Sequence, residues 1–151
     1  MCKDIKERAS PYAKEGTDAH SLCEHKVLTA LGRDSPDPTD NLDYFDAEMD
    51  ECSDEYRNFV MEQVADAKTR CDDPLVLVEE RLDFSRWVPE AFGTGDCVIV
   101  GDDILTTIDF KYGVGVLVDA ENNAQMRCYA LGAYDAYGHL YRSPPACPLC
   151  R

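Results

Sequence analysis

Three side chains in the second half of the chain, Asp96, Asp109 and Lys111, have the types and spacing for phosphate chemistry. Two short apolar runs, residues 97–100 and 104–110, flank a Gly-Asp-Asp sequence, and this pattern predicts a β-hairpin. Partner numbers across such a hairpin add to 205, which places Asp96 opposite Asp109. Because side chains alternate along a strand, we expect all three to converge on one face.

A divalent cation would offset the repulsion between the two converging carboxylates. Two carboxylates that face each other across a strand pair repel unless something neutralises them. Mg²⁺ is typically held by one or two carboxylates together with substrate phosphate oxygens. The cation lowers the pKa of an attacking water, which Lys111 would orient or help to deprotonate. These residues therefore predict metal-dependent cleavage of phosphodiester bonds, although an Asp-x-Lys sequence is common and an ordinary solvent-facing strand is an equal alternative from the residues alone.

The spacing of apolar residues, together with Pro- and Gly-containing segments that interrupt it, predicts the helices and strands that position these side chains. Residues 11–31 and about 45–71 repeat apolar side chains at helical spacing, with Thr17 and Asp18 as possible early caps of the first helix. The predicted order is α-α-β-β-β-α-β, an α/β (α+β) fold with a mixed central sheet flanked by helices. The later elements are expected as a strand at 75–84, a loop at 85–95, the hairpin, a helix at 121–137 and a last strand at 138–142.

Length and composition indicate one folded domain. The chain has 151 residues, 44% hydrophobic and 30% charged, so we expect a single domain over residues 1–151 with an irregular tail at 143–151. No apolar run approaches the roughly 18 residues needed to cross a bilayer, and the first residues lack the apolar core of a signal peptide. These features predict a cytoplasmic protein that does not bind membranes.

The net charge of −15 opposes simple binding to nucleic acid, which usually requires a basic surface. The acid is concentrated, however, because ten carboxylates and no Lys or Arg lie between Asp34 and Tyr56. If these acids lie on one face, another face could still approach nucleic acid. A protein partner would be a further source of basic surface. An acidic mimic of DNA is a further alternative, although such a run is more often a solvated face.

Several motifs together resemble a known nuclease family. The strings FGTGDCVIVGDDILTTIDFKYG and NNAQMRCYALGAY, preceded by EGTDAH in the first helix, are similar to the RecB-like exonuclease branch of the PD-(D/E)xK nuclease superfamily. The resemblance is strongest to a phage-associated family of nuclease-like proteins within that branch and covers about residues 15–141. It implies a restriction-endonuclease-like core and a DNA substrate.

The resemblance also implies residue roles. It makes Lys111 the catalytic lysine and pairs Gln125 with Tyr129, whose spacing of four puts them on one helical face near the strands or the nucleic-acid backbone. Glu79 or Glu80 would be a supporting acid. Each assignment has a structural alternative, since a single helical His is usually structural and a helical Tyr often packs in a core. The implied ligands of Mg²⁺ or Mn²⁺ are His20, Asp96, Asp109 and the backbone carbonyl of Phe110.

The ends of the chain differ from that family. Its members usually extend further at both ends, so we expect a shortened version. Some RecB-like nucleases hold an iron-sulfur cluster with one early and three late cysteines. Cys2, Cys147 and Cys150 supply only three such positions, so neither a cluster nor zinc is expected.

The expected function is therefore a divalent-metal-dependent, exonuclease-like DNA nuclease of phage DNA metabolism or recombination. The alternative is a catalytically inactive binding or structural phage protein with the nuclease fold.

Overall fold

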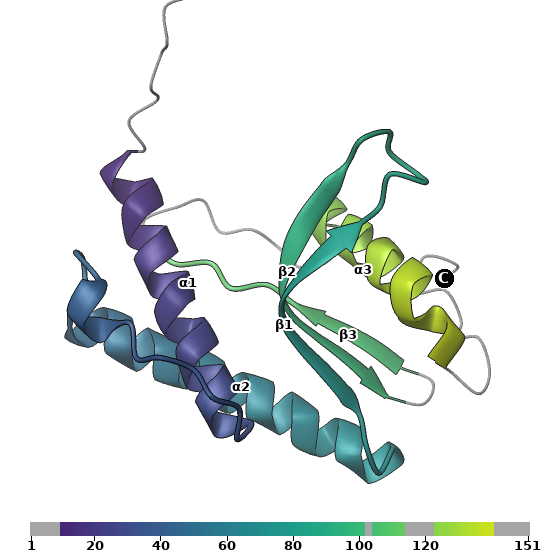
Figure 1. Cartoon of the computed structure of the whole chain (residues 1–151), viewed down its shortest axis with the longest axis horizontal. Helices are drawn as coiled ribbons and strands as arrows, with labels where there is room; N and C mark the ends of the chain where they lie inside the picture. Colours follow the sequence, from purple (N-terminus) through teal and green to yellow (C-terminus); the bar gives the residue numbers. More distant parts are fainter. Residues whose placement is uncertain (1–9, 102–103, 114–122, 141–151) are drawn as a thin grey trace, which may run out of the picture.

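The computed structural model describes residues 10–101, 104–113 and 123–140. Within them the chain has a mixed α+β fold of three α-helices and a three-stranded sheet, in agreement with the predicted class (Figure 1). Two 3₁₀ turns, Thr39–Asn41 and Gly138–Leu140, complete the order. The main elements are α1 (Pro11–Ala30), α2 (Ala47–Arg70), β1 (Leu75–Asp83), β2 (Phe92–Gly101), β3 (Ile104–Ile108) and α3 (Ala124–Tyr137).

Side-chain caps set the starts of the helices. The Ser10 hydroxyl accepts a hydrogen bond from the Ala13 N–H, and proline occupies the first position of α1, where its missing N–H costs nothing. The expected capping by Thr17 and Asp18 is wrong, because the helix already begins at Pro11 and both residues lie inside it. Instead, the Asp18 carboxylate accepts a hydrogen bond from the Tyr44 N–H and ties the following loop to α1.

The sheet is antiparallel, with strand order β1-β2-β3. The predicted hairpin register is confirmed: Cys97 pairs with Ile108 and Gly101 with Ile104, and each pair adds to 205. The predicted last strand is wrong over Gly138–Leu140, which form a 3₁₀ turn, while residues 141–142 lie outside the described ranges. No parallel pair occurs among the strands that the structure describes, so the expected mixed character of the sheet is not seen there.

The sheet separates two apolar layers, with α1 and α2 on one face and α3 on the other (Figure 1). On the first face Cys97, Ile99 and Ile108 pack against α1 and α2. On the second, Val98 and Val100 pack in the cluster that includes Tyr129 of α3. This alternation along β2 is the expected period of two. Within the described residues, no helix combines the length and apolarity needed to cross a membrane.

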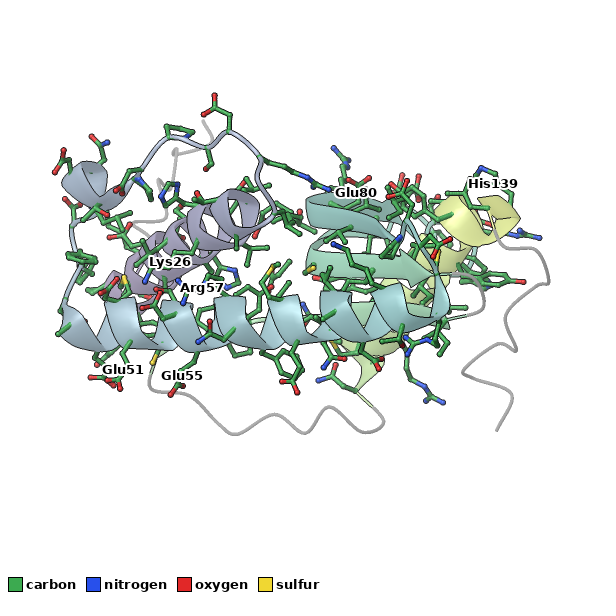
Figure 2. All side chains as sticks on the ribbon, turned by 90° about the horizontal axis from the view of Figure 1, so that it is seen from below. Lys26, Glu51, Glu55, Arg57, Glu80 and His139 are labelled. Atoms are coloured by element: carbon green, nitrogen blue, oxygen red, sulfur yellow. The ribbon has the colours of Figure 1, made fainter. Side chains whose placement is uncertain are left out.

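Ion pairs join the two helices on the first face. The Lys26 ammonium of α1 lies 2.6 Å from the Asp50 carboxylate and 2.8 Å from that of Asp54 on α2. Figure 2 shows Lys26 pointing between the helices, whereas Glu51 and Glu55 project from the opposite side of α2. Part of the acidic run is thus neutralised at the helix contact, and part is exposed to solvent.

Candidate functional site

Within β1, the side chains change from one face of the sheet to the other at Glu79, and this change determines which acidic side chains lie together. Glu79 has a φ of 51°, in the left-handed region that non-glycine residues seldom adopt. The pairs Val78–Cys97 and Glu80–Gly95 flank it and both add to 175, so no residue is inserted. The faces nevertheless change: Val78 packs on the α1 and α2 side, but Leu82, four residues on, packs on the α3 side.

The neighbouring strand shows the same reversal at Asp96. Regular alternation would place Asp96 on the α3 side with Val98. Its carboxylate instead lies beside the His20 ring of α1, with 3.4 Å between Oδ1 and Nδ1. The predicted face of Asp96 is therefore wrong, because alternation assumes extended backbone throughout and the distortion at Glu79 interrupts it.

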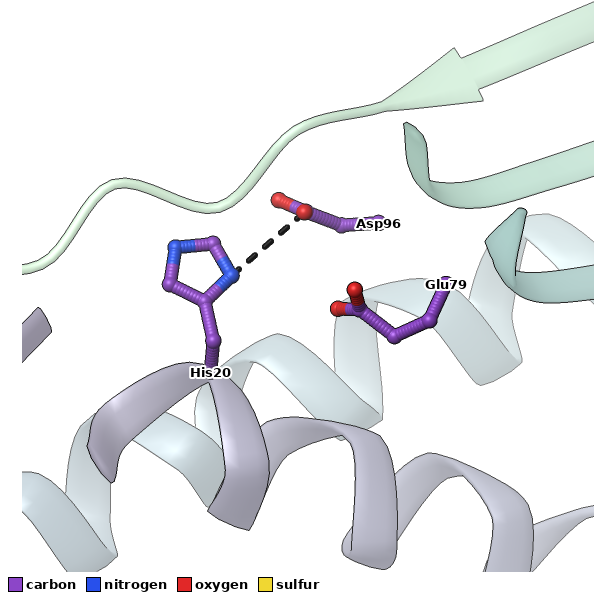
Figure 3. Close-up of side chains that lie close together, drawn as sticks. All are labelled: His20, Glu79 and Asp96. Atoms are coloured by element: carbon purple, nitrogen blue, oxygen red, sulfur yellow. Dashed lines mark ion pairs between the residues drawn. The ribbon is translucent and has the colours of Figure 1, made fainter. Parts of the chain in front are cut away.

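The reversal assembles a compact group of possible metal ligands. One ligand atom each from His20, Glu79 and Asp96 lies within 4.8 Å of the others (Figure 3). Asp96 is only 7% exposed, and its Oδ2 accepts a hydrogen bond of 2.5 Å from the Phe110 N–H. The three side chains come from α1, β1 and β2, so their relative positions depend on the packed core.

Burial and mutual repulsion shift the proton affinities of this group. Burial, and next the charge of Asp96, raises the pKa of Glu79 to about 7. The hydrogen bond to Asp96 raises the pKa of His20 despite the opposing effect of burial. Without a cation, the charged form of Glu79 is thus disfavoured and that of His20 is favoured.

These shifts predict how pH affects stability in the presence of EDTA. Glu79 has a raised pKa when folded, so the folded state holds its proton more tightly than the unfolded state, in which the pKa is near 4.5. Its contribution to the free energy of unfolding is therefore fully present below pH 4.5 and is lost as the pH rises through about 7. We expect Glu79→Gln to flatten this decline and to raise the melting temperature at pH 8. An unchanged slope in the variant would contradict the assignment.

Glu80, the alternative supporting acid, lies on the other face. Its carboxylate accepts a hydrogen bond from the Tyr137 hydroxyl of α3. Among these two adjacent acids, Glu79 is the one that contacts the candidate site. The sequence carries no sign of this choice, since it rests on the backbone conformation of one residue.

Asp109 and Lys111 form the second part of the site. The Lys111 ammonium lies 2.8 Å from the Asp109 carboxylate, and the lysine side chain is 57% exposed. Burial opposes a rise in the pKa of Lys111, but the hydrogen bond to Asp109 and the charges of Asp109 and Asp96 outweigh it. Asp109 is not among the ligand atoms that cluster with Asp96. Its carboxylate pairs instead with the Lys111 ammonium, whose pKa the charge of Asp96 also raises.

Phe110 links these two parts. Its N–H donates a hydrogen bond to the Asp96 carboxylate. Its ring packs against the His20 ring, with 5.5 Å between centroids. The segment after β3 is therefore held directly above the His20, Glu79 and Asp96 group.

Gln125 and Tyr129 share one face of α3, as their spacing predicts. The Gln125 side-chain amide donates a hydrogen bond of 2.7 Å to the Tyr129 hydroxyl. Tyr129 is buried, whereas Gln125 is exposed, so the pair extends from the core to the surface. The electrostatic influence of Tyr129 on the pKa of Lys111 places the two side chains in one neighbourhood.

A close approach in β2 positions Tyr129 and gives a test of this packing. A Cβ atom on Gly93 would lie 2.6 Å from Cε1 of Tyr129. We expect Gly93→Ala to lower the free energy of unfolding by about 1–3 kcal/mol, because the ring must move. Gly16→Ala, in α1 with nothing within 4 Å, is expected to raise it by about 0.5–1 kcal/mol. Urea unfolding measures both, and equal stability of Gly93→Ala and wild type would contradict the contact.

An open cleft of about 670 Å³ borders the second part of the site. Its walls come from α1, α2 and the segment after β3, and they include Asp109 and Lys111. Glu15, Glu48 and Glu55 make the remainder strongly acidic. A smaller groove of about 280 Å³ also borders Lys111 and is lined mainly by Thr, Met, Phe and Ile side chains. Among its described lining residues, Asp109 is the one carboxylate.

The predictions for the three terminal cysteines, Cys2, Cys147 and Cys150, fall outside the described residues, as does the tail at 143–151.

The comparisons identify a family but not a structural relative. No solved structure matches the chain. The family model described as "Protein of unknown function (DUF2800)" matches residues 1–144. The chain therefore belongs to the DUF2800 family.

Proposed function

We propose that the protein is a divalent-metal-dependent nuclease that hydrolyses phosphodiester bonds in DNA, with exonuclease-like action. The observation that carries the proposal is the convergence of His20, Glu79 and Asp96, within electrostatic reach of the Lys111 ammonium. Metal-assisted phosphodiester hydrolysis requires residues that can bind a divalent cation, and a solvent-accessible lysine near them can contact the substrate phosphate. The resemblance to RecB-like nucleases supports the same chemistry and places it in phage DNA metabolism or recombination.

The donor set suits a hard or borderline divalent cation. Two carboxylates and one imidazole match Mn²⁺ well, and Mg²⁺ accepts the oxygen ligands. Burial and the charge of Asp96 raise the pKa of Glu79, so a cation in place of its proton would stabilise its charged form. A bound cation would polarise the scissile phosphate and activate the attacking water.

Each residue in the proposal has a separate task. His20 and Asp96 are the proposed ligands that both the geometry and the resemblance support. The third protein ligand is Glu79 by geometry, whereas the resemblance implies Asp109 and the Phe110 carbonyl. Lys111 orients the attacking water or stabilises charge on the phosphate.

The surroundings of Lys111 favour one direction of approach for DNA. The large cleft is lined by carboxylates that repel a phosphate backbone. In the smaller groove beside Thr106, Thr107 and Met126, Asp109 is the one carboxylate among the described lining residues, so this repulsion is weaker there, and Gln125 lies on the adjoining helix. We therefore place the substrate strand on this side, with a basic protein partner as a possible source of further affinity.

Hydrolysis of defined DNA substrates tests the proposal. The protein is incubated with end-labelled linear single-stranded and double-stranded DNA, and with covalently closed circles, in Mg²⁺, Mn²⁺ or EDTA. We expect release of labelled nucleotides from linear DNA only when a cation is present, and little attack on circles. No release from any substrate by protein that binds Mn²⁺ would instead support the catalytically inactive alternative.

A further inference from the structure

Tyr56 of α2 carries a buried hydroxyl without a partner. Its side chain is 9% exposed, and no atom of the described residues forms a hydrogen bond with its Oη. Leaving a buried donor unsatisfied costs about 1–3 kcal/mol, so such groups usually meet a water or a ligand. Phenylalanine would fill the same space without this cost. The hydroxyl therefore needs a partner beyond the contacts that the described residues provide.

The position of Tyr56 points to the metal site as the place of that partner. Its ring packs on Phe110, with 5.0 Å between centroids. Phe110 in turn contacts the His20 ring and donates its N–H to Asp96. Tyr56 also lines the cleft that contains Asp109 and Lys111. It is thus the α2 residue packed directly behind the segment that covers the ligand group.

The electrostatics of the phenol agree with this position. Burial raises its pKa, and the nearby carboxylates of Asp96 and Glu79 raise it further. The hydroxyl consequently stays protonated at neutral pH and acts as a hydrogen-bond donor. Its neighbours include the two carboxylates that require neutralisation when a cation is absent.

We propose that Tyr56 is a positioning residue of the metal site, whose hydroxyl donates a hydrogen bond to a water molecule that enters with the cation. The inference rests on the proposed function, because it assumes that the His20, Glu79 and Asp96 group binds a divalent ion. The water would lie between the phenol and the carboxylates of Glu79 and Asp96. Partners at this distance from a metal orient its ligands and typically contribute 10–100-fold to affinity.

The test compares two tyrosines that both pack against Phe110. Tyr56→Phe removes the buried hydroxyl and keeps the ring. Tyr112→Phe is the matched control. The Tyr112 ring also stacks on Phe110, with 6.2 Å between ring centroids, and Tyr112 is half-buried in the same cleft. Mn²⁺ alone is titrated into each full-length protein by calorimetry, and melting temperatures are measured in EDTA.

We expect Tyr56→Phe to bind Mn²⁺ about tenfold more weakly than wild type. Its melting temperature in EDTA should equal or exceed that of wild type, because the unsatisfied hydroxyl is gone. Tyr112→Phe should match wild type in Mn²⁺ affinity. This combination separates a role in the metal site from a purely structural one.

Three results would overturn the inference. Unchanged Mn²⁺ affinity in Tyr56→Phe shows that the hydroxyl has no link to the cation. A lower melting temperature in EDTA with unchanged affinity identifies a buried structural water as its partner. Absence of Mn²⁺ binding by wild type removes both this inference and the proposed function, whereas the first two results leave the proposed function intact.

Discussion

Replacement of Lys111 by alanine is expected to lower the rate of DNA hydrolysis by about 10²–10⁴-fold, with little change in Mn²⁺ affinity. The ammonium is the one cationic group placed beside the ligand cluster by the described residues, and its side chain is 57% exposed and can reach a substrate. It is not itself a metal ligand, because ammonium has no lone pair to donate. The loss should therefore appear in turnover rather than in metal binding.

The Lys111→Ala experiment needs a lysine control from the same chain. Lys68→Ala serves this purpose, because Lys68 is an exposed residue in the last turn of α2. We expect the control to retain wild-type activity. If Lys111→Ala and the control have equal, undiminished nuclease activity, Lys111 has no role in the mechanism. An equal loss of activity in both variants would indicate a nonspecific effect of charge.

Replacement of Asp96 by asparagine is expected to weaken Mn²⁺ binding by at least about 100-fold and to abolish nuclease activity. Asp96 is the central member of the site: its carboxylate contacts His20 and accepts the Phe110 N–H, and its charge raises the pKa of Glu79. Asparagine keeps an oxygen for the Phe110 N–H, so we expect the fold to remain. Calorimetric titration with Mn²⁺ measures the effect.

Asp83→Asn is the matched control for Asp96→Asn. Asp83 ends β1, and its carboxylate accepts a hydrogen bond from the Ser85 N–H, an interaction that asparagine can keep. Mn²⁺ binding by this variant should equal that of wild type. Undiminished binding by Asp96→Asn would contradict the ligand cluster and, with it, the proposed nuclease centre.

The same titration on Asp109→Asn decides between the two sets of ligands. His20 and Asp96 belong to both. Loss of Mn²⁺ binding means that Asp109 leaves Lys111 to join the cation, as the resemblance implies. Retained binding limits the protein ligands to the observed group with Glu79.

Prediction from the sequence succeeded where the physical signal is local. The helices at Pro11–Ala30 and Ala47–Arg70 follow from apolar side chains that repeat at helical spacing. The register of the hairpin follows from two apolar runs around a short turn, because each residue added to one strand is matched by one in the other. No long-range information is needed for either result.

Prediction failed where a local pattern is overruled by packing. Phe92–Gly95 falls in the loop that the sequence predicts at 85–95, yet it forms the start of β2. There the missing side chains are useful: Cβ atoms on Gly93 and Gly95 would crowd Tyr129 and Leu82. Gly138–Leu140 was expected to be a strand but continues from α3 as a 3₁₀ turn.

The helices, the hairpin register and the set of chemically capable residues can be read from spacing along the chain. Which of those residues meet depends on how the helices and strands pack in three dimensions. The left-handed backbone at Glu79 reverses the faces of two strands and turns Asp96 toward His20 instead of Asp109. Such a conformation is unfavourable for an isolated residue and persists because the surrounding core holds it, so no pattern of neighbouring letters reveals it.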